Sequence, residues 1–222
     1  MADFVNTIDV LGDDTVIDSI IERTITEFKD DTVTTVGQSA FRECTELALV
    51  DLPKATETKG YAFLGCTSLK DVALPNVTVC EYDTFRKCQS LEHAYVPIAK
   101  DFFTSVFRGC KALKKLDLPS IKSISGYVFA GAESLVALVI RSPEIATLLN
   151  VSAFKYINET SPIAEGTGYI YVPRALLSDT DETKDYRRAT NWSTYSAQFR
   201  ALEDFTVDGT TTGELDETKL AA

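Results

Sequence analysis

A repeat of 22 residues constrains the fold of this chain more than any other feature of its sequence. Phenylalanine, cysteine and leucine return at the same three positions in five successive units, with Ala132 in place of the fifth cysteine. The columns are Phe41, Phe63, Phe85, Phe107 and Phe129; Cys44, Cys66, Cys88 and Cys110; and Leu47, Leu69, Leu91, Leu113 and Leu135. A period of roughly 20 to 50 residues is typical of solenoids and other repeat architectures.

One unit reads as two short strands joined by turns. Phe41, Cys44 and Leu47 follow at three-residue steps, which places them on one side of a short helical or 3₁₀ turn. Val50 and Leu52 alternate as in a strand, and the next proline ends the ladder because it has no N–H to donate. One unit cannot bury its apolar side chains, but stacked units can. We therefore expect an α/β repeat fold, a solenoid of about five to six 22-residue coils with helical N- and C-terminal caps.

This interpretation divides the chain into segments. Residues 1–30 are expected to form an N-terminal cap or attachment segment, with a helix behind Asp13 and Asp14. Residues 31–143 form the solenoid. Residues 144–205 carry a degenerate last repeat, around Phe154 and Tyr171, and a helical C-terminal cap. The cap is predicted as one or two amphipathic helices, with Ser193 as a candidate N-cap, because apolar residues recur at three- and four-residue steps: Tyr186, Ala189, Trp192, Tyr195, Phe199 and Leu202.

The last segment, residues 206–222, is an acidic tail that is rich in threonine. Its composition predicts disorder, since the tail has few apolar side chains to bury. We expect it to be ordered only where a neighbouring chain holds it, which favours a homo-oligomer or a larger assembly.

Charge and composition exclude several function classes. The chain has 33 acidic and 22 basic residues, a formal charge of −11, which would repel a nucleic-acid backbone. No apolar run reaches the roughly 20 residues of a membrane span, so no membrane partner is expected. The opening residues 1–9 lack the basic and apolar regions of a secretory signal, and we therefore expect synthesis in the cytoplasm without classical export. A single histidine also argues against a histidine-built metal site, and no cofactor is expected.

The cysteines allow two interpretations. Stacked coils would place successive cysteines roughly 5 Å apart, within the range of a disulfide, and a redox or metal role is then possible. The column of Cys44, Cys66, Cys88 and Cys110 shares its face with phenylalanine and leucine, however, which favours a buried and inert ladder. Cys80 takes a core position that Val36 and Ile124 share, and is predicted to pack in the same way.

The remaining question is what the outward residues do. By register with Leu49 and Asp71, His93 points away from the core, and no serine or cysteine is aligned with it as a catalytic partner. We therefore predict no enzyme. Aromatic residues and arginines lead in interface cores, so the candidate binding surface comprises Tyr61, Tyr95, Tyr127, His93, Arg42, Arg86 and Arg108. The alternative is that a repeat tolerates any residue outside its core.

The unit AF-x-x-C-x-x-L-x-x-x-x-LP resembles the BspA-like class of leucine-rich repeats over Val33 to Pro143. The end segments, NTIDVLGDDTVIDSIIERTITEF and GYIYVPRALLSDTDETKDYRRATNWSTYSAQFRALED with the final DGTTTGELD, are similar to leucine-rich-repeat proteins of tailed phages and prophages of Gram-positive bacteria. The second resemblance implies a virion protein, made in the host cytoplasm, that decorates the particle or forms part of a tail or fibre.

The expected function is thus non-enzymatic, with the repeat surface presented for binding to the host surface. Its partners would be other virion proteins and a host cell-surface protein or glycan, with several copies adding avidity. The alternative is a bacterial cell-surface adhesin of the same repeat class, exported without a classical signal. A hydrolase that acts on host glycans is a third class, and it would need a cleft with paired carboxylates.

Overall fold

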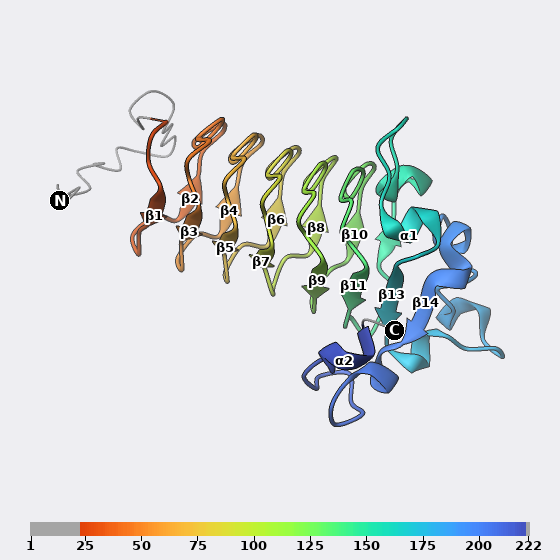
Figure 1. The fold of residues 1–222 in the computed structure, drawn as a ribbon. Coiled ribbons are helices and arrows are strands. Elements are labelled where there is room, and N and C mark those ends of the chain that lie inside the picture. The colour runs from red at the N-terminus through yellow and green to blue at the C-terminus, as the bar shows by residue number, and fades with distance from the viewer. Residues whose placement is uncertain (1–22, 221–222) are drawn as a thin grey trace.

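Each unit of the repeat forms one coil of a rod, and the coils stack side by side along the rod axis (Figure 1). The computed structural model describes residues 23–220. The helix predicted behind Asp13 and Asp14 lies outside the described residues. Strand β1 (Glu27–Lys29) lies within the segment expected as an N-terminal cap and already pairs in parallel with β3. The stacked sheet therefore begins before residue 31.

The strands form three parallel sheets on two sides of the rod. One side, which we call the long-strand side, carries two sheets of four strands. Their strands are β1, β3 (Leu49–Asp51), β5 (Asp71–Ala73) and β7 (His93–Tyr95), then β9 (Lys115–Leu118), β11 (Ala137–Ile140), β13 (Tyr169–Val172) and β14 (Phe199–Ala201). The other side, the short-strand side, is one sheet of β2 (Thr35–Val36), β4 (Glu57–Thr58), β6 (Val79–Cys80), β8 (Asp101–Phe102), β10 (Ser123–Ile124) and β12 (Thr147–Leu148).

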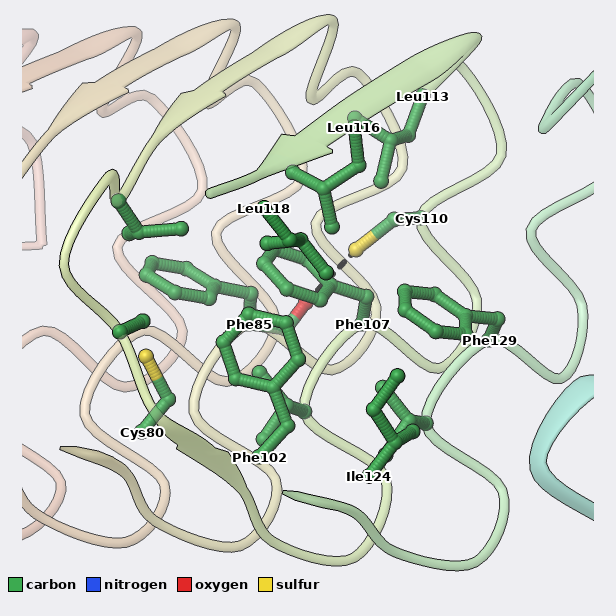
Figure 2. Packing of buried hydrophobic residues seen from close by; sticks show 14 of the residues in the cluster. Cys80, Phe85, Phe102, Phe107, Cys110, Leu113, Leu116, Leu118, Ile124 and Phe129 are labelled. Carbon is green, nitrogen blue, oxygen red and sulfur yellow. Dashed lines mark hydrogen bonds between the residues drawn. The ribbon is translucent and has the colours of Figure 1, made fainter. Parts of the chain in front are cut away.

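The repeated apolar residues fill the space between the two sides (Figure 2). The phenylalanine column stacks ring on ring from Phe41 to Phe129 and continues onto Phe154, with centroids 5.1–6.1 Å apart. Phe28 closes the N-terminal end of this column edge-on against Phe41. The solenoid is confirmed, and Phe154 supplies the core position of its degenerate last coil, as expected.

The turns between the two sides form a third hydrogen-bond ladder. Two residues per coil have φ between 56° and 76°: Ser39, Tyr61, Asp83, Ser105 and Tyr127 at the first position, and Glu43, Gly65, Lys87, Gly109 and Gly131 at the second. The N–H of each donates to a carbonyl of the next coil at 2.7–3.2 Å. The left-handed conformation thus directs these N–H groups along the rod axis, so that the turns stack as tightly as the strands.

The long-strand side is interrupted between β7 and β9, which lie next to each other without forming one sheet. The inward column of this side runs through Phe28, Val50, Val72, Ala94, Leu116, Leu138 and Ile170. Ala94 is its smallest member and is only partly buried. The interruption therefore coincides with the coil that has the least apolar volume to hold its strand against the core.

The C-terminal cap differs from the amphipathic helices predicted for it. Apart from α1 (Pro162–Glu165) and α2 (Glu217–Leu220), the described helices are short 3₁₀ elements: η1 (Val151–Phe154), η2 (Arg174–Leu176), η3 (Glu182–Lys184), η4 (Trp192–Gln198) and η5 (Leu202–Phe205). Phe199 belongs to strand β14, and Ser193 lies inside η4, whose N-cap is Asn191. Steps of three residues fit a 3₁₀ turn as well as an α-helix, and the cap accordingly contains short 3₁₀ turns in place of long amphipathic helices.

The cap satisfies the backbone of the last short strand with side chains. Beside β12, Tyr186 Oη accepts from the Ala146 N–H at 2.7 Å, and Trp192 Nε1 donates to the Ala146 carbonyl at 2.6 Å. Asn191 Nδ2 donates to the Leu148 carbonyl at 2.6 Å. An exposed sheet edge invites pairing with other chains, and these side chains block it.

The acidic tail is ordered on its own chain over the described residues 206–220, contrary to the disorder that its composition predicts. Leu215 and Leu220 are buried with Leu202 against Ala137, Val139 and Tyr171 on the outer surface of β11 and β13. Arg141 Nη1 donates to the carbonyls of Thr211 and Gly213 at 2.6 and 3.0 Å. Two leucines and one arginine thus hold the segment where overall composition suggested nothing to bury.

Candidate functional site

The cysteine column lies inside the rod and donates hydrogen bonds along it. The Sγ atoms of Cys66, Cys88 and Cys110 each donate to a phenylalanine carbonyl of the preceding coil, at 3.0–3.1 Å. Desolvation raises the pKa of the Cys44 thiol to about 11 and that of Cys80 to about 12, and it also raises the pKa values of Cys88 and Cys110. All five thiols are buried and free, and those of Cys66, Cys88 and Cys110 serve as weak donors between coils.

The seven residues of the candidate binding surface fall on two separate parts of the rod. His93 and Tyr95 lie on β7, on the outer surface of the long-strand side. The other five belong to the turns that carry the left-handed residues: Tyr61, Tyr127, Arg42, Arg86 and Arg108. The structure does not bring the two groups together into one site.

Most of the turn residues already have partners within the chain. Arg108 donates from Nε and Nη2 to the two carboxylate oxygens of Glu159 at 2.6 and 3.1 Å, and its guanidinium lies 4.0 Å from the ring centre of Tyr156. Arg108 holds the pKa of Glu159 below its ordinary value. Arg86 bonds to Asp83, and Tyr61 and Tyr127 pack edge-on against Tyr82 and Tyr156. The two tyrosine pairs join neighbouring coils, whereas Arg86 and Asp83 belong to the same turn.

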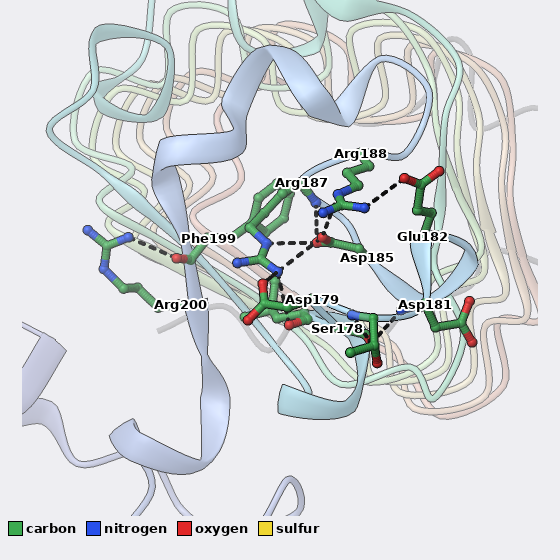
Figure 3. A network of polar contacts seen from close by, with 11 residues as sticks. Ser178, Asp179, Asp181, Glu182, Asp185, Arg187, Arg188, Phe199 and Arg200 are labelled. Atoms are coloured by element: carbon green, nitrogen blue, oxygen red, sulfur yellow. Dashed lines mark hydrogen bonds and ion pairs between the residues drawn. The ribbon is translucent and has the colours of Figure 1, made fainter.

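The contact between Arg108 and Glu159 was not visible in the repeat pattern. Glu159 lies 51 residues further along the chain, in the degenerate coil, where the 22-residue register no longer applies. The same is true of the polar network in the cap (Figure 3), where buried Asp185 accepts from Arg187 Nε at 2.8 Å and Arg188 also approaches. Arg187 holds the pKa of Asp185 below its ordinary value.

The long-strand side presents two outward columns. They run through Glu27, Leu49, Asp71, His93, Lys115, Ala137 and Tyr169, and through Lys29, Asp51, Ala73, Tyr95, Asp117, Val139 and Tyr171. The C-terminal segment covers the part over β9, β11 and β13. We call the remaining outward residues of β3, β5 and β7 the open face: Leu49, Asp51, Asp71, Ala73, His93 and Tyr95.

The open face is mildly acidic; Asp71, His93 and Tyr95 are exposed on it, and its other three residues are partly buried. Tyr95 keeps 59% of its surface accessible, the largest exposed ring among the described residues. His93 Nδ1 lies 2.8 Å from Asp71 Oδ1, and both side chains are more than half exposed. The register that predicted an outward His93 is thus confirmed by the pairing of β5 with β7. The histidine has a carboxylate partner that the alignment of strands brings to it.

Two shallow grooves border this side. One, of about 650 Å³, lies between β9 and the C-terminal segment and is lined by Lys115, Asp117, Arg141, Glu214 and Glu217 among others. Asp117 is bonded by Arg141, and Glu217 by Lys115, so two of its carboxylates are neutralised. The other, of about 450 Å³, lies at the N-terminal end beside Asp51. No cluster of three or more metal-ligating side chains occurs within residues 23–220.

Comparison with known proteins bears on the repeat. The model of the BspA type leucine-rich repeat region matches residues 20–136 in six copies. A leucine-rich repeat protein from T. pallidum, TpLRR, is 29% identical, with a TM-score of 0.50, over 55% of this chain and 58% of its own length. One from Bacteroides ovatus is 18% identical, with a TM-score of 0.37, over 65% of this chain and 44% of its own. The chain thus spans less than two thirds of either structure.

No curated protein matches the chain. In the part of the chain that the structure describes, no helix has the length and apolarity needed to cross a membrane.

Proposed function

Because the chain belongs to the BspA-type leucine-rich repeat family, we propose that it is a non-enzymatic recognition protein whose open face binds a partner on a cell surface. The observation that carries this proposal is the separation, within the repeat, of buried packing residues from exposed outward residues. The phenylalanine, cysteine and leucine columns are buried to 2% exposure or less, whereas Tyr95, His93 and Asp71 lie outward in one cluster. Aromatic residues that stay exposed on a rigid sheet are the usual anchors of binding surfaces.

The proposal is tested with the purified chain on cells of Gram-positive bacteria, the hosts of the phages whose proteins the end segments resemble. Labelled wild-type protein should bind, and Tyr95→Ala should reduce the bound fraction severalfold without a change in thermal unfolding, because the side chain contacts solvent. Tyr82→Ala serves as a control, since Tyr82 is 38% exposed on another part of the rod. Equal binding by both variants and the wild type would refute a role for the open face.

We further propose that the chain is a structural protein of the head, tail or fibre of a phage particle and that it binds the cell surface there. The support is the similarity of the end segments to leucine-rich-repeat proteins of tailed phages. Several copies on one particle would convert weak individual contacts into useful avidity. Antibody labelling of purified particles in the electron microscope should detect the chain at a fixed location, and its absence from purified particles would end this part of the proposal.

A bacterial surface adhesin is the second candidate. The T. pallidum protein is a bacterial leucine-rich repeat protein, which favours this setting for the repeat. Detection of the chain on cells that carry no prophage and have not been infected would support it over the virion role.

A further inference from the structure

The covered part of the long-strand side indicates which chemistry its outer surface accepts. Over β13 and β14, the guanidinium of Arg200 lies 4.1 Å from the ring centre of Tyr169. Over β9 and β11, Arg141 donates from Nε and Nη2 to Asp117 at 2.8–2.9 Å. In both places an arginine of the same chain contacts an outward side chain: it stacks on the ring of Tyr169 and bonds to the carboxylate of Asp117.

The open face has the same groups in the same columns without such an arginine. Tyr95 lies in the column of Asp117 and Tyr171, together with Asp51, and Asp71 lies in the column of Tyr169. Over residues 23–220, no lysine or arginine side chain bonds to the carboxylate of Asp51 or Asp71, and no guanidinium stacks on Tyr95. Asp71 Oδ1 faces His93 Nδ1 at 2.8 Å, so the groups of the open face that another molecule can engage are Asp51, Tyr95 and the second carboxylate oxygen of Asp71.

Charge complementarity selects a cation. The groove beside Asp51 is also lined by Asp31, and the lysine that lines it, Lys29, pairs with Glu27. The carboxylates are not clustered as metal ligands anywhere in the described chain. A tyrosine ring beside carboxylates is a suitable site for a planar guanidinium, which stacks and bonds at the same time.

We propose that the open face binds an arginine-bearing segment of a partner protein. This proposal rests on the proposed function and specifies the chemistry of its partner. One guanidinium stacks on Tyr95 and bonds to Asp71, and a second reaches Asp51. Asp51 and Tyr95 are two coils apart, or about 9.6 Å at the usual strand spacing. A polyproline II segment places residues i and i+3 on one side about 9.3 Å apart, so the motif Arg-x-x-Arg matches this interval.

The test uses a synthetic peptide as the probe, acetyl-Pro-Arg-Pro-Pro-Arg-Pro-amide, titrated into the full chain and followed by calorimetry or by amide shifts. Matched peptides carry lysine or uncharged citrulline in place of both arginines. We expect weak binding of the arginine peptide, about threefold weaker binding of the lysine peptide, and loss of binding with citrulline. Raised salt should weaken the complex, because the pairs are exposed.

The variants Tyr95→Ala, Asp51→Asn and Asp71→Asn should each weaken arginine-peptide binding by about three- to tenfold. The controls are Tyr82→Ala and Glu57→Gln, which remove a ring and a charge from other surfaces. Binding that is equal for the arginine and citrulline peptides, or that is unchanged in Tyr95→Ala, would overturn the proposal. If binding to host cells depends on Tyr95 but is competed by purified cell-wall polysaccharide and not by the arginine peptide, the arginine proposal fails and the proposed function stands. If host-cell binding is also independent of Tyr95, both fail.

Discussion

At the scale of single residues, the second left-handed position of each coil differs in backbone strain from one coil to the next. Glycine occupies it in Gly65, Gly109 and Gly131, but Glu43 and Lys87 adopt the same positive φ with a side chain attached. For a residue with a Cβ this conformation is strained by about 1–2 kcal/mol. At this second position, the coils that contain Glu43 and Lys87 therefore tolerate strain that glycine avoids in the other three.

Lys87→Gly should raise the free energy of unfolding by about 0.5–1 kcal/mol, because the relief of strain exceeds the flexibility that glycine adds to the unfolded chain. The matched change Gly109→Ala should lower it by about 1 kcal/mol for the same conformational reason. Its added Cβ would meet Lys87 only at 3.7–3.8 Å, an ordinary contact. Urea denaturation of both variants checks the pair, and a stabilised Gly109→Ala would contradict the account.

Sequence alone predicted the interior residues because the same three residue types recur in one register. It could not reveal the first left-handed position, which holds serine, tyrosine or aspartate and has no residue type in common. Their residue type places Tyr61 and Tyr127 in the candidate binding surface, whereas their backbone belongs to this turn ladder. At the first left-handed position the backbone conformation repeats from coil to coil, but the residue type does not.

At the scale of elements, the C-terminal cap depends on side chains that take the place of a further strand. The 3₁₀ segments around Tyr186 and Trp192 direct an Oη and an Nε1 to the two polar groups of Ala146. The same rings pack edge-on at 5.4 Å. A sequence pattern shows that these aromatic residues are apolar and periodic, but not that their polar atoms are aimed at a strand edge.

Trp192→Phe should lower the free energy of unfolding by about 1–3 kcal/mol, because the buried Ala146 carbonyl loses its donor while most of the ring volume is kept. Tyr186→Phe should cost a similar amount through the Ala146 N–H. Denaturation curves give the values. A cost below the error of the measurement in both variants would show that β12 does not need these partners.

The buried carboxylate of the cap predicts a pH dependence. Hydrogen bonds from Arg187 lower the pKa of Asp185 in the folded chain, so its contribution to stability is fully present above the ordinary pKa of an aspartate, about 4. This contribution is lost as the pH falls through the lowered folded value. Asp185→Asn should therefore unfold more easily at neutral pH and lose less stability than the wild type on acidification. Parallel loss in both proteins below pH 4 would contradict this role.

At the scale of the whole molecule, the rod is a stack whose coils mainly contact their neighbours, closed at one end by the cap and covered on part of one side by residues 206–220 (Figure 1). The repeat period was enough to predict the stack. The position of the C-terminal segment was not predictable, because it depends on contacts between Arg141 and backbone carbonyls 70 and 72 residues away.

Removal of residues 206–222 should leave the coils folded, since each coil depends on its neighbours and not on the segment. It should uncover Ala137, Val139 and Tyr171, lower the melting temperature by about 2–8 °C and increase self-association. Circular dichroism and analytical ultracentrifugation measure these effects against the full chain. Loss of the cooperative transition would show instead that the segment is part of the folding unit.

The central claim is that the recurring columns hold the coils together and leave binding to the outer surface. Its most direct test is the reactivity of the five cysteines toward an aromatic disulfide reagent in native buffer at pH 8, compared with the unfolded chain in denaturant. Because all five thiols are buried, we predict that they react only at the rate of unfolding, and the raised pKa values of Cys44, Cys80, Cys88 and Cys110 slow these four further. A thiol of the column that reacts rapidly in the folded protein would contradict the claim.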